Sequence, residues 1–197
     1  KRIFADHVLI STGGKSFAVY GSTGDGQIIA RKLGHTVKPM TPALTAIEIK
    51  ENINELKGIR AKVKASLFCL DKLVFCEKGE IQFREDSISG ICIMNMSSRL
   101  PVSSFADGGK SMESCKIVIN FVDDFTSAAL VSFLRNEADN ICTTTSDMLK
   151  TLVRDSVAKE ILRRTAISPD KEAKHLTTEE ILSIANGLRM FTLTPTG

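Results

Sequence analysis

Several residue types that carry well-known chemistry are scarce in this sequence. It contains no tryptophan, one tyrosine and three histidines among 197 residues. The histidines (His7, His35 and His175) stand far apart and none has metal-ligand spacing to a cysteine, so no metal site is expected. None of the five cysteines belongs to a Cys-x-x-Cys pair, which excludes zinc fingers and redox dithiols. We therefore expect reduced, buried thiols.

Excess charge and long apolar runs are also lacking. The net charge is only +3, and lysine and arginine are scattered along the chain, so no basic stripe for nucleic acid is expected. The longest apolar runs, such as 91–96 and 128–134, fall far short of the roughly 20 residues that a membrane span requires. No secretory signal is visible. These features predict a soluble cytoplasmic protein with neither nucleic acid nor membrane as a partner.

The two ends of the chain both carry strand-like patterns. The sequence opens on Lys1-Arg2-Ile3 without a methionine, and it closes on Pro195-Thr196-Gly197 without a polar tail. We therefore expect an internal segment of a longer protein.

Glycine is concentrated near the N-terminus. An apolar run at 5–11 stops at Thr12-Gly13-Gly14, which predicts a buried strand that ends in a tight turn. The glycine-rich loop from Gly21 to Gly26 precedes a predicted helix at 27–33, with Gly34 as its C-cap. Such a loop can bind phosphate, because glycine lets backbone amides approach an anion. Its spacing matches neither a Walker A loop nor a dinucleotide fingerprint, so spacing alone favours a structural turn.

A change of period follows a proline-containing segment. Pro39 and Pro42 place a boundary near residue 40. Apolar and polar residues then alternate along 62–69, which predicts a strand with one solvated face. Further strands are predicted at 73–76, 80–84, 91–96 and 115–121, with turns at 77–79 and 106–109. This spacing predicts a compact, mainly β unit that resembles a small barrel.

Helical patterns occupy the region from Asp123 onward. A helix is predicted to start at the acidic pair Asp123-Asp124, and another to be capped by Thr145 or Ser146. Thr177 and Glu180 form a capping box for a last helix. The sequence thus predicts three or four helices in a small bundle. No nucleophile elbow or carboxylate pair accompanies them, so the catalytic residues remain unknown.

Longer strings of residues resemble a known family, the BaiN and aminoacetone-oxidase-like FAD-dependent flavoproteins. The matching strings are Val8 to Ser16, Gly21 to Gly26, Leu33-Gly34-His35, Pro42-Ala43-Leu44, Leu56 to Ile59, Ile88-Ser89-Gly90 and Asn95-Met96-Ser97. The resemblance implies an FAD-binding α/β domain that is split in sequence by a β unit and a helical unit. The implied fold class is α+β, with a barrel-like unit and a helical bundle flanked by remnants of the flavin domain.

The resemblance also implies a division of the chain and a set of site residues. Residues 1–40 would be a remnant of the FAD-binding domain, 41–122 the β insert unit, 123–190 the helical insert unit, and 191–197 a return strand to the FAD-binding domain. The residues expected beside FAD are Thr12, Gly13, Gly14, Gly21, Ser22, Thr23, Gly24, Asp25 and Gly26. The parent enzyme would move a hydride between flavin and a small organic substrate, and NAD(P)H is left open as its electron source. The chain alone is expected to lack activity, with the rest of the flavin domain as its partner.

Two other functions stay open at this point. The chain could be a noncatalytic interaction module, which predicts an exposed apolar face on the helices between Asp123 and Gly187. It could also bind phosphate through Gly21 to Gly26 alone, without the rest of a flavin domain.

Overall fold

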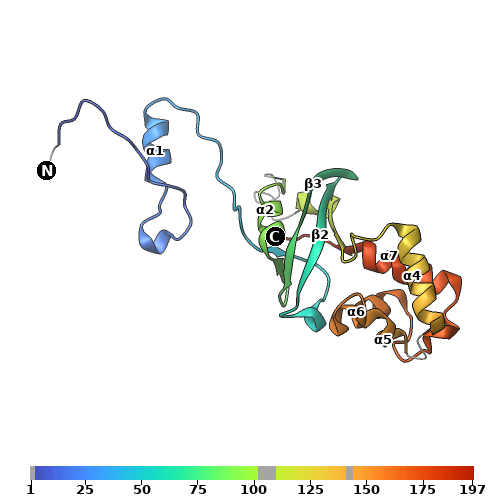
Figure 1. Cartoon of the computed structure of the whole chain (residues 1–197). Helices are drawn as coiled ribbons and strands as arrows, with labels where there is room; N and C mark the ends of the chain where they lie inside the picture. The colour runs from blue at the N-terminus through green and yellow to red at the C-terminus, as the bar shows by residue number, and fades with distance from the viewer. Residues whose placement is uncertain (1–2, 102–109, 141–143) are drawn as a thin grey trace. The chain divides into compact units, whose positions relative to one another are not determined.

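The structure is a computed structural model that describes residues 3–101, 110–140 and 144–197 (Figure 1). The chain divides into two compact units, Lys1–Thr41 and Pro42–Gly197. The first unit contains a short 3-10 helix, Ala18–Tyr20, and helix α1, Asp25–Lys32. The strand predicted at 5–11 is not formed. This segment has no regular structure and no partner strand within the described part of the first unit, and a strand is stabilised by bonds to a neighbour.

Helix α1 ends as its sequence predicts. Gly34 adopts a positive φ of 90°, and its N–H donates to the carbonyl of Arg31 at 3.1 Å. The next N–H, from His35, reaches back to the carbonyl of Ala30 at 3.0 Å. These bonds satisfy carbonyls at the end of the helix, where a residue with a side chain would be strained.

The second unit is built on a six-stranded antiparallel sheet with the order β1-β4-β3-β2-β5-β6. The strands are β1 (Ile47–Glu48), β2 (Arg60–Cys69), β3 (Lys72–Phe83), β4 (Ser87–Ser89), β5 (Cys115–Asn120) and β6 (Phe191–Leu193). The sheet curls until its edges meet. Ile49 bridges Pro195, and the N–H of Glu48 donates to the carbonyl of Gly197 at 2.7 Å. The predicted barrel-like α+β fold is thereby confirmed.

Strand β2 follows its predicted alternation. Val63, Ala65 and Leu67 are buried, while the residues between them are partly or fully exposed. The long ribbon of β2 and β3 is visible in Figure 1. One face of this ribbon therefore belongs to the core, as the period of two predicts.

Strand β3 runs unbroken through a predicted turn. Two short strands were expected, with a turn at 77–79, but Lys72–Phe83 is one strand. The glycine that suggested a turn has another role. A Cβ at Gly79 would lie 2.9 Å from the Cβ of Cys92, so the missing side chain leaves room for the helix that packs there.

That helix, α2 (Ile91–Ser97), replaces a predicted strand at 91–96. Its buried residues are Cys92, Ile93, Met96 and Ser97. Their spacing is that of one helical face, and the short apolar run hid it. Gly90 precedes the helix with a φ of 103°, where a side chain would clash with the carbonyl of Glu80. The turn predicted at 106–109 lies outside the described residues.

Four α-helices of the described residues lie between β5 and β6 in sequence: α4 (Ser127–Asn140), α5 (Thr145–Lys150), α6 (Asp155–Thr165) and α7 (Thr178–Arg189). Short 3-10 helices lie at Asn54–Leu56, Lys110–Ser114 and Ala173–His175. None of the helices within the described ranges combines the length and apolarity needed to cross a membrane.

The helix starts differ from two predictions. Helix α4 begins at Ser127, because Asp123 instead forms ion pairs with Lys64 and Lys78 of the sheet. The cap of α5 is Thr144, whose hydroxyl accepts the N–H of Asp147 at 3.2 Å.

Of the two remaining helix-cap predictions, one is wrong and one is confirmed. Thr145, expected as a cap, is buried and donates to the carbonyl of Lys171 at 2.9 Å. The capping box of Thr177 and Glu180 on α7 is confirmed.

The last strand and the cysteines tie the sheet together. Residues 191–197 were assigned as a return strand to the flavin domain, and the structure pairs Phe191–Leu193 with β5 in the sheet of the second unit. Cys69 and Cys115, register partners on β2 and β5, form a disulfide. The expectation of reduced thiols is therefore wrong for this pair, because strand pairing joins two residues 46 positions apart. Cys142 lies outside the described residues.

Candidate functional site

The predicted cofactor residues gather at the start of α1. Gly26 is buried against Thr12, and a Cβ at Gly26 would clash with the Thr12 hydroxyl. The side-chain amide of Gln27 donates to the carbonyl of Gly13 at 2.8 Å. The absent side chain at Gly26 thus lets the Thr-Gly-Gly turn lie directly on the first turn of the helix.

A cavity of about 310 Å³ opens beside this contact. It is lined by Ile10, Ser11, Thr12, Gly13, Gly26, Gln27, Ala30 and Val37. Of the nine predicted site residues, the structure brings Thr12, Gly13 and Gly26 to this cavity. The remaining predicted residues do not line it: Gly14, Gly21, Ser22, Thr23, Gly24 and Asp25.

The loop before α1 has a conformation that requires glycine. Gly21 and Gly24 have φ values of 90° and 88°, a region that residues with a side chain rarely adopt. Gly24 is the N-cap of α1 and supplies no side-chain cap, and the side chain of Lys15 packs against it. A helix N-terminus next to a lysine is a favourable place for a phosphate. Asp25, in the first turn of α1, brings a carboxylate to the same end of the helix.

Gln27 is a residue of this site that sequence reasoning missed. Its Nε2 holds the Thr-Gly-Gly turn, while its Oε1 is buried without a partner among the described residues. A glutamine in an amphipathic helix gives no sequence signal for such a role, since the carbonyl that it contacts is 14 residues away.

The titratable side chains elsewhere form no further catalytic set. The three histidines are exposed, and no group of three metal-ligating side chains occurs within the described parts of the chain. Cys92 is buried under β3, and burial raises the pKa of its thiol to about 11. That thiol donates to the carbonyl of Glu80 at 3.4 Å, so it is a protonated core group and no nucleophile.

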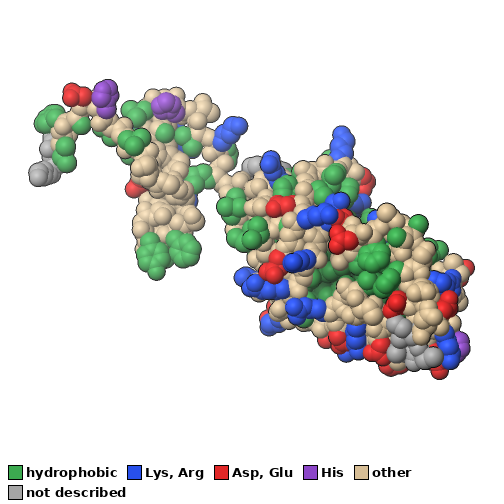
Figure 2. Space-filling model, viewed as in Figure 1, with side chains coloured by type: hydrophobic (Ala, Val, Ile, Leu, Met, Phe, Trp, Pro, Cys, Tyr) green, Lys and Arg blue, Asp and Glu red, His purple; other side chains and the backbone are tan. Residues whose placement is uncertain are grey.

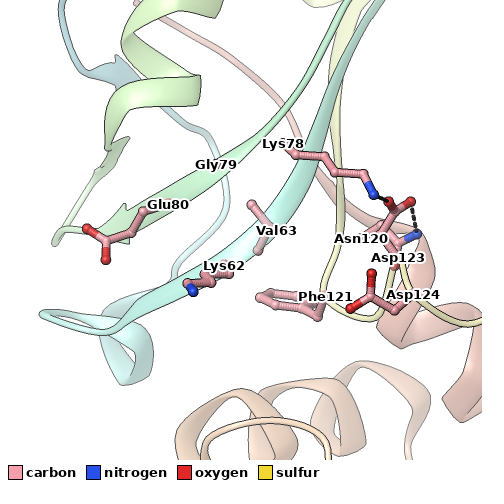
Figure 3. Close-up of a pocket in the computed structure, with 9 residues that line it drawn as sticks. All are labelled: Lys62, Val63, Lys78, Gly79, Glu80, Asn120, Phe121, Asp123 and Asp124. Carbon is pink, nitrogen blue, oxygen red and sulfur yellow. Dashed lines mark hydrogen bonds and ion pairs between the residues drawn. The ribbon is translucent and has the colours of Figure 1, made fainter.

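A second hollow lies in the larger unit and was not predicted. Its volume is about 410 Å³, and Figure 3 shows the side chains that line it. Lys62, Lys78 and Glu80 come from β2 and β3, whereas Phe121 and Asp124 follow β5. Sequence positions 40 to 60 residues apart thus share one surface, which no local pattern could reveal.

The chain is similar to known proteins over most of its length. A family model described as HI0933-like protein barrel and H2TH domain matches residues 41–197. A 3-dehydro-bile acid delta(4,6)-reductase of Clostridium scindens is 29% identical over 129 residues, which cover 65% of this chain. The same residues cover 30% of that relative, so the chain matches less than a third of its length. The family match begins after the glycine-rich loop.

Proposed function

The chain belongs to the HI0933-like family of BaiN-like, FAD-dependent oxidoreductases, and we propose that it is the insert region of such an enzyme with part of the flavin domain. One observation carries this proposal. The first and last strand segments of the second unit are neighbours, since Glu48 accepts the N–H of Thr196 at 2.8 Å. A unit whose two ends adjoin can be inserted into another domain without separating that domain's strands.

The first unit has the surface of a domain fragment. Phe4, Leu9 and Val19 are each at least 90% exposed, which is unusual for large apolar side chains. In the proposed enzyme, these side chains pack against the rest of the flavin domain, and residues 1–40 form part of that domain. Because the covering segments would come from elsewhere in the protein, the chain alone is expected to be inactive.

The proposed role of the glycine-rich site is to hold FAD. Thr12, Gly13 and Gly14 would lie beside the cofactor, and the loop from Gly21 to Gly26 would support them. The support is local: the absence of a side chain at Gly26 lets Thr12 pack on the first turn of α1, which places the Thr-Gly-Gly turn next to the helix N-terminus.

Bound FAD would supply the redox chemistry, and the protein would bind and orient the reactants. The substrate would be a small organic molecule. A 3-dehydro-bile acid is the first compound to test, because the similar protein of Clostridium scindens is named as a reductase of such acids. NAD(P)H is the proposed electron source and the cytoplasm the proposed location. Both proposals rest on the family membership alone.

The alternative of an interaction module has less support. It requires an exposed apolar face on the helices between Asp123 and Gly187. Among the described residues of that span, Leu182 is the large apolar side chain that is exposed, at 45%. The stripes of α4 and α6, including Leu130, Leu134 and Ile161, are buried.

The experiment that tests the proposal measures flavin content. Purified full-length protein should show flavin absorbance, and Gly26→Val should lower its FAD occupancy because the new side chain displaces Thr12. Ala128→Val on the exposed start of α4 is the matched control and should leave occupancy unchanged. A full-length protein without flavin would contradict the proposed function. Full occupancy in Gly26→Val would contradict only the role of the glycine-rich loop.

A further inference from the structure

A groove runs between the first half of β2 and the start of α6. It consists of the 410 Å³ hollow of Figure 3 and a neighbouring hollow of about 550 Å³. The two are continuous, since Lys62, Glu80, Phe121 and Asp124 line both. Hydrophobic side chains gather on this side of the second unit in Figure 2, with charged ones around them. We call this feature the β2–α6 groove.

The hollow of Figure 3 is lined mainly by apolar surface, whereas polar and apolar surface contribute about equally to the neighbouring hollow. Val63 and Phe121 contribute from the sheet side, and Leu152, Val153 and Val157 from the helical side. The Phe121 ring is half-buried and held from behind by Phe191, whose ring centroid is 5.5 Å away. A fixed aromatic and aliphatic floor favours the apolar body of a ligand.

Most charges around the groove neutralise one another. Lys78 pairs with Asp123, and Arg60 pairs with Glu80 at 3.1 Å. These pairs leave little net charge for a ligand.

Three charged side chains of the rim remain. Lys62, Arg154 and Asp124 form no ion pair or side-chain hydrogen bond among the described residues. The hydrogen bond with Asp123 raises the pKa of Lys78, and the Asp124 carboxylate nevertheless attracts the same ammonium and helps to raise this pKa. The Phe121 ring lies between the Lys62 ammonium and the Asp124 carboxylate in Figure 3. Two unpaired cations against one unpaired anion leave the rim net positive.

The backbone N–H of Lys62 is a further group that could donate a hydrogen bond to an anion. The N–H of Phe83 donates to the carbonyl of Ile59 at 2.9 Å, so Ile59 faces β3. By the alternation of an antiparallel strand, Lys62 directs its own N–H and carbonyl away from β3. On that side β5 ends at Asn120, the register partner of Lys64, so within the described residues Lys62 has no ladder partner there. The Lys62 N–H thus lacks a ladder partner among the described residues, at a position that lines the groove.

We propose that the β2–α6 groove binds an amphipathic organic anion, a carboxylate whose apolar body lies on Phe121 and whose charged group faces Lys62 and Arg154. This site is separate from the glycine-rich loop and does not depend on FAD binding. The apolar floor supplies the affinity, and the unpaired cations with the Lys62 N–H supply the preference for negative charge.

The test compares three ligands that differ only in their head group. Decanoate, decanol and decylammonium are titrated into the 197-residue chain by isothermal calorimetry, below the concentrations at which they form micelles. Decanoate should bind at one site and more tightly than decanol, with decylammonium weakest. Equal binding of all three, or tighter binding of decylammonium, would overturn the proposal.

Variants that are expected to change the decanoate affinity in opposite directions locate the site. Lys62→Gln and Arg154→Gln should each weaken decanoate binding about threefold, because each removes one partly solvated cation. Asp124→Asn should strengthen it by a similar factor, since it removes the unpaired anion. Lys72→Gln, a loss of the same charge at an exposed position at the far end of β3, is the control. If Lys72→Gln weakens decanoate binding as much as Lys62→Gln does, or if Lys62→Gln, Arg154→Gln and Asp124→Asn leave the affinity unchanged, the binding is elsewhere and the proposal fails.

Discussion

The guanidinium of Arg164 lies over the ring of Phe191, with its central carbon 3.8 Å from the ring centroid. The same guanidinium donates to the carbonyl of Thr192 at 2.8 Å and to Glu160 at 2.7 Å. One side chain of α6 thus contacts the last strand of the sheet through its ring and its backbone. Glu160 is 3% exposed, so its charge depends on these hydrogen bonds.

Replacing Arg164 should destabilise the second unit. Arg164→Leu removes the ring contact and the bond to β6, and it leaves the buried Glu160 with Arg163 alone. We expect a loss of about 2–4 kcal/mol in the free energy of unfolding. Urea unfolding followed by circular dichroism measures it. Arg163→Leu, at a guanidinium that is 63% exposed, is the control and should cost less. Equal losses would show that the contact with Phe191 contributes nothing.

Acid should weaken the same contact. Burial raises the pKa of Glu160, but the hydrogen bonds from Arg163 and Arg164 outweigh it and hold the pKa below its usual 4.5. A carboxylate with a lowered pKa stabilises the fold at neutral pH, and this stabilisation is lost as pH falls below 4.5 and through the folded-state value. The stability difference between the wild type and Glu160→Gln should therefore shrink between pH 6 and about pH 3. A difference that is constant over this range would contradict the lowered pKa.

The disulfide between β2 and β5 should contribute to stability through the unfolded state. It closes a loop between residues 46 positions apart, which corresponds to a loss of up to about 4 kcal/mol when Cys69 and Cys115 are both replaced by alanine. The measurement is the urea midpoint under non-reducing conditions. Cys76→Ala, at an exposed free thiol, serves as the control. If dithiothreitol leaves the wild-type midpoint unchanged, the two sulfurs are not joined in solution.

The two free cysteines of the described chain should differ sharply in reactivity. Burial raises the pKa of Cys92 to about 11, so its thiol remains protonated at pH 8, whereas Cys76 is exposed. Iodoacetamide at pH 8 should therefore alkylate Cys76 first and Cys92 only after unfolding. Peptide mapping by mass spectrometry gives both rates. Equally fast labelling of Cys92 in the folded protein would show that α2 opens readily.

Local sequence patterns correctly predicted the elements that depend on residues close to one another in the sequence. The alternation of Val63, Ala65 and Leu67 reflects the two faces of one strand, and the capping box of Thr177 and Glu180 lies within one helical turn. The wrong predictions concern residues whose packing partners lie far away in the sequence. Gly79 was taken for a turn because nothing near it reveals that Cys92 packs on it. The pairing of strands decides such cases, and a single sequence does not show it.

The candidate site likewise contains residues that could be predicted from the sequence and residues that could not. The resemblance to flavoproteins named Thr12, Gly13 and Gly26, and the structure brings these residues together. The hydrogen bond of Gln27 and the rim of the β2–α6 groove depend on contacts between distant segments, so no spacing rule could have found them.

The hydrogen bonds between Glu48 and residues 196–197 have a consequence for protein engineering. Neighbouring strands lie about 5 Å apart, so a short peptide can join the two sides of this pair in place of the whole second unit. In the proposed enzyme, the flavin domain would therefore tolerate loss of the unit, or its exchange for a homologue's, with little change in its own backbone path. Exchanging the unit between related enzymes would then show which of their properties depend on it.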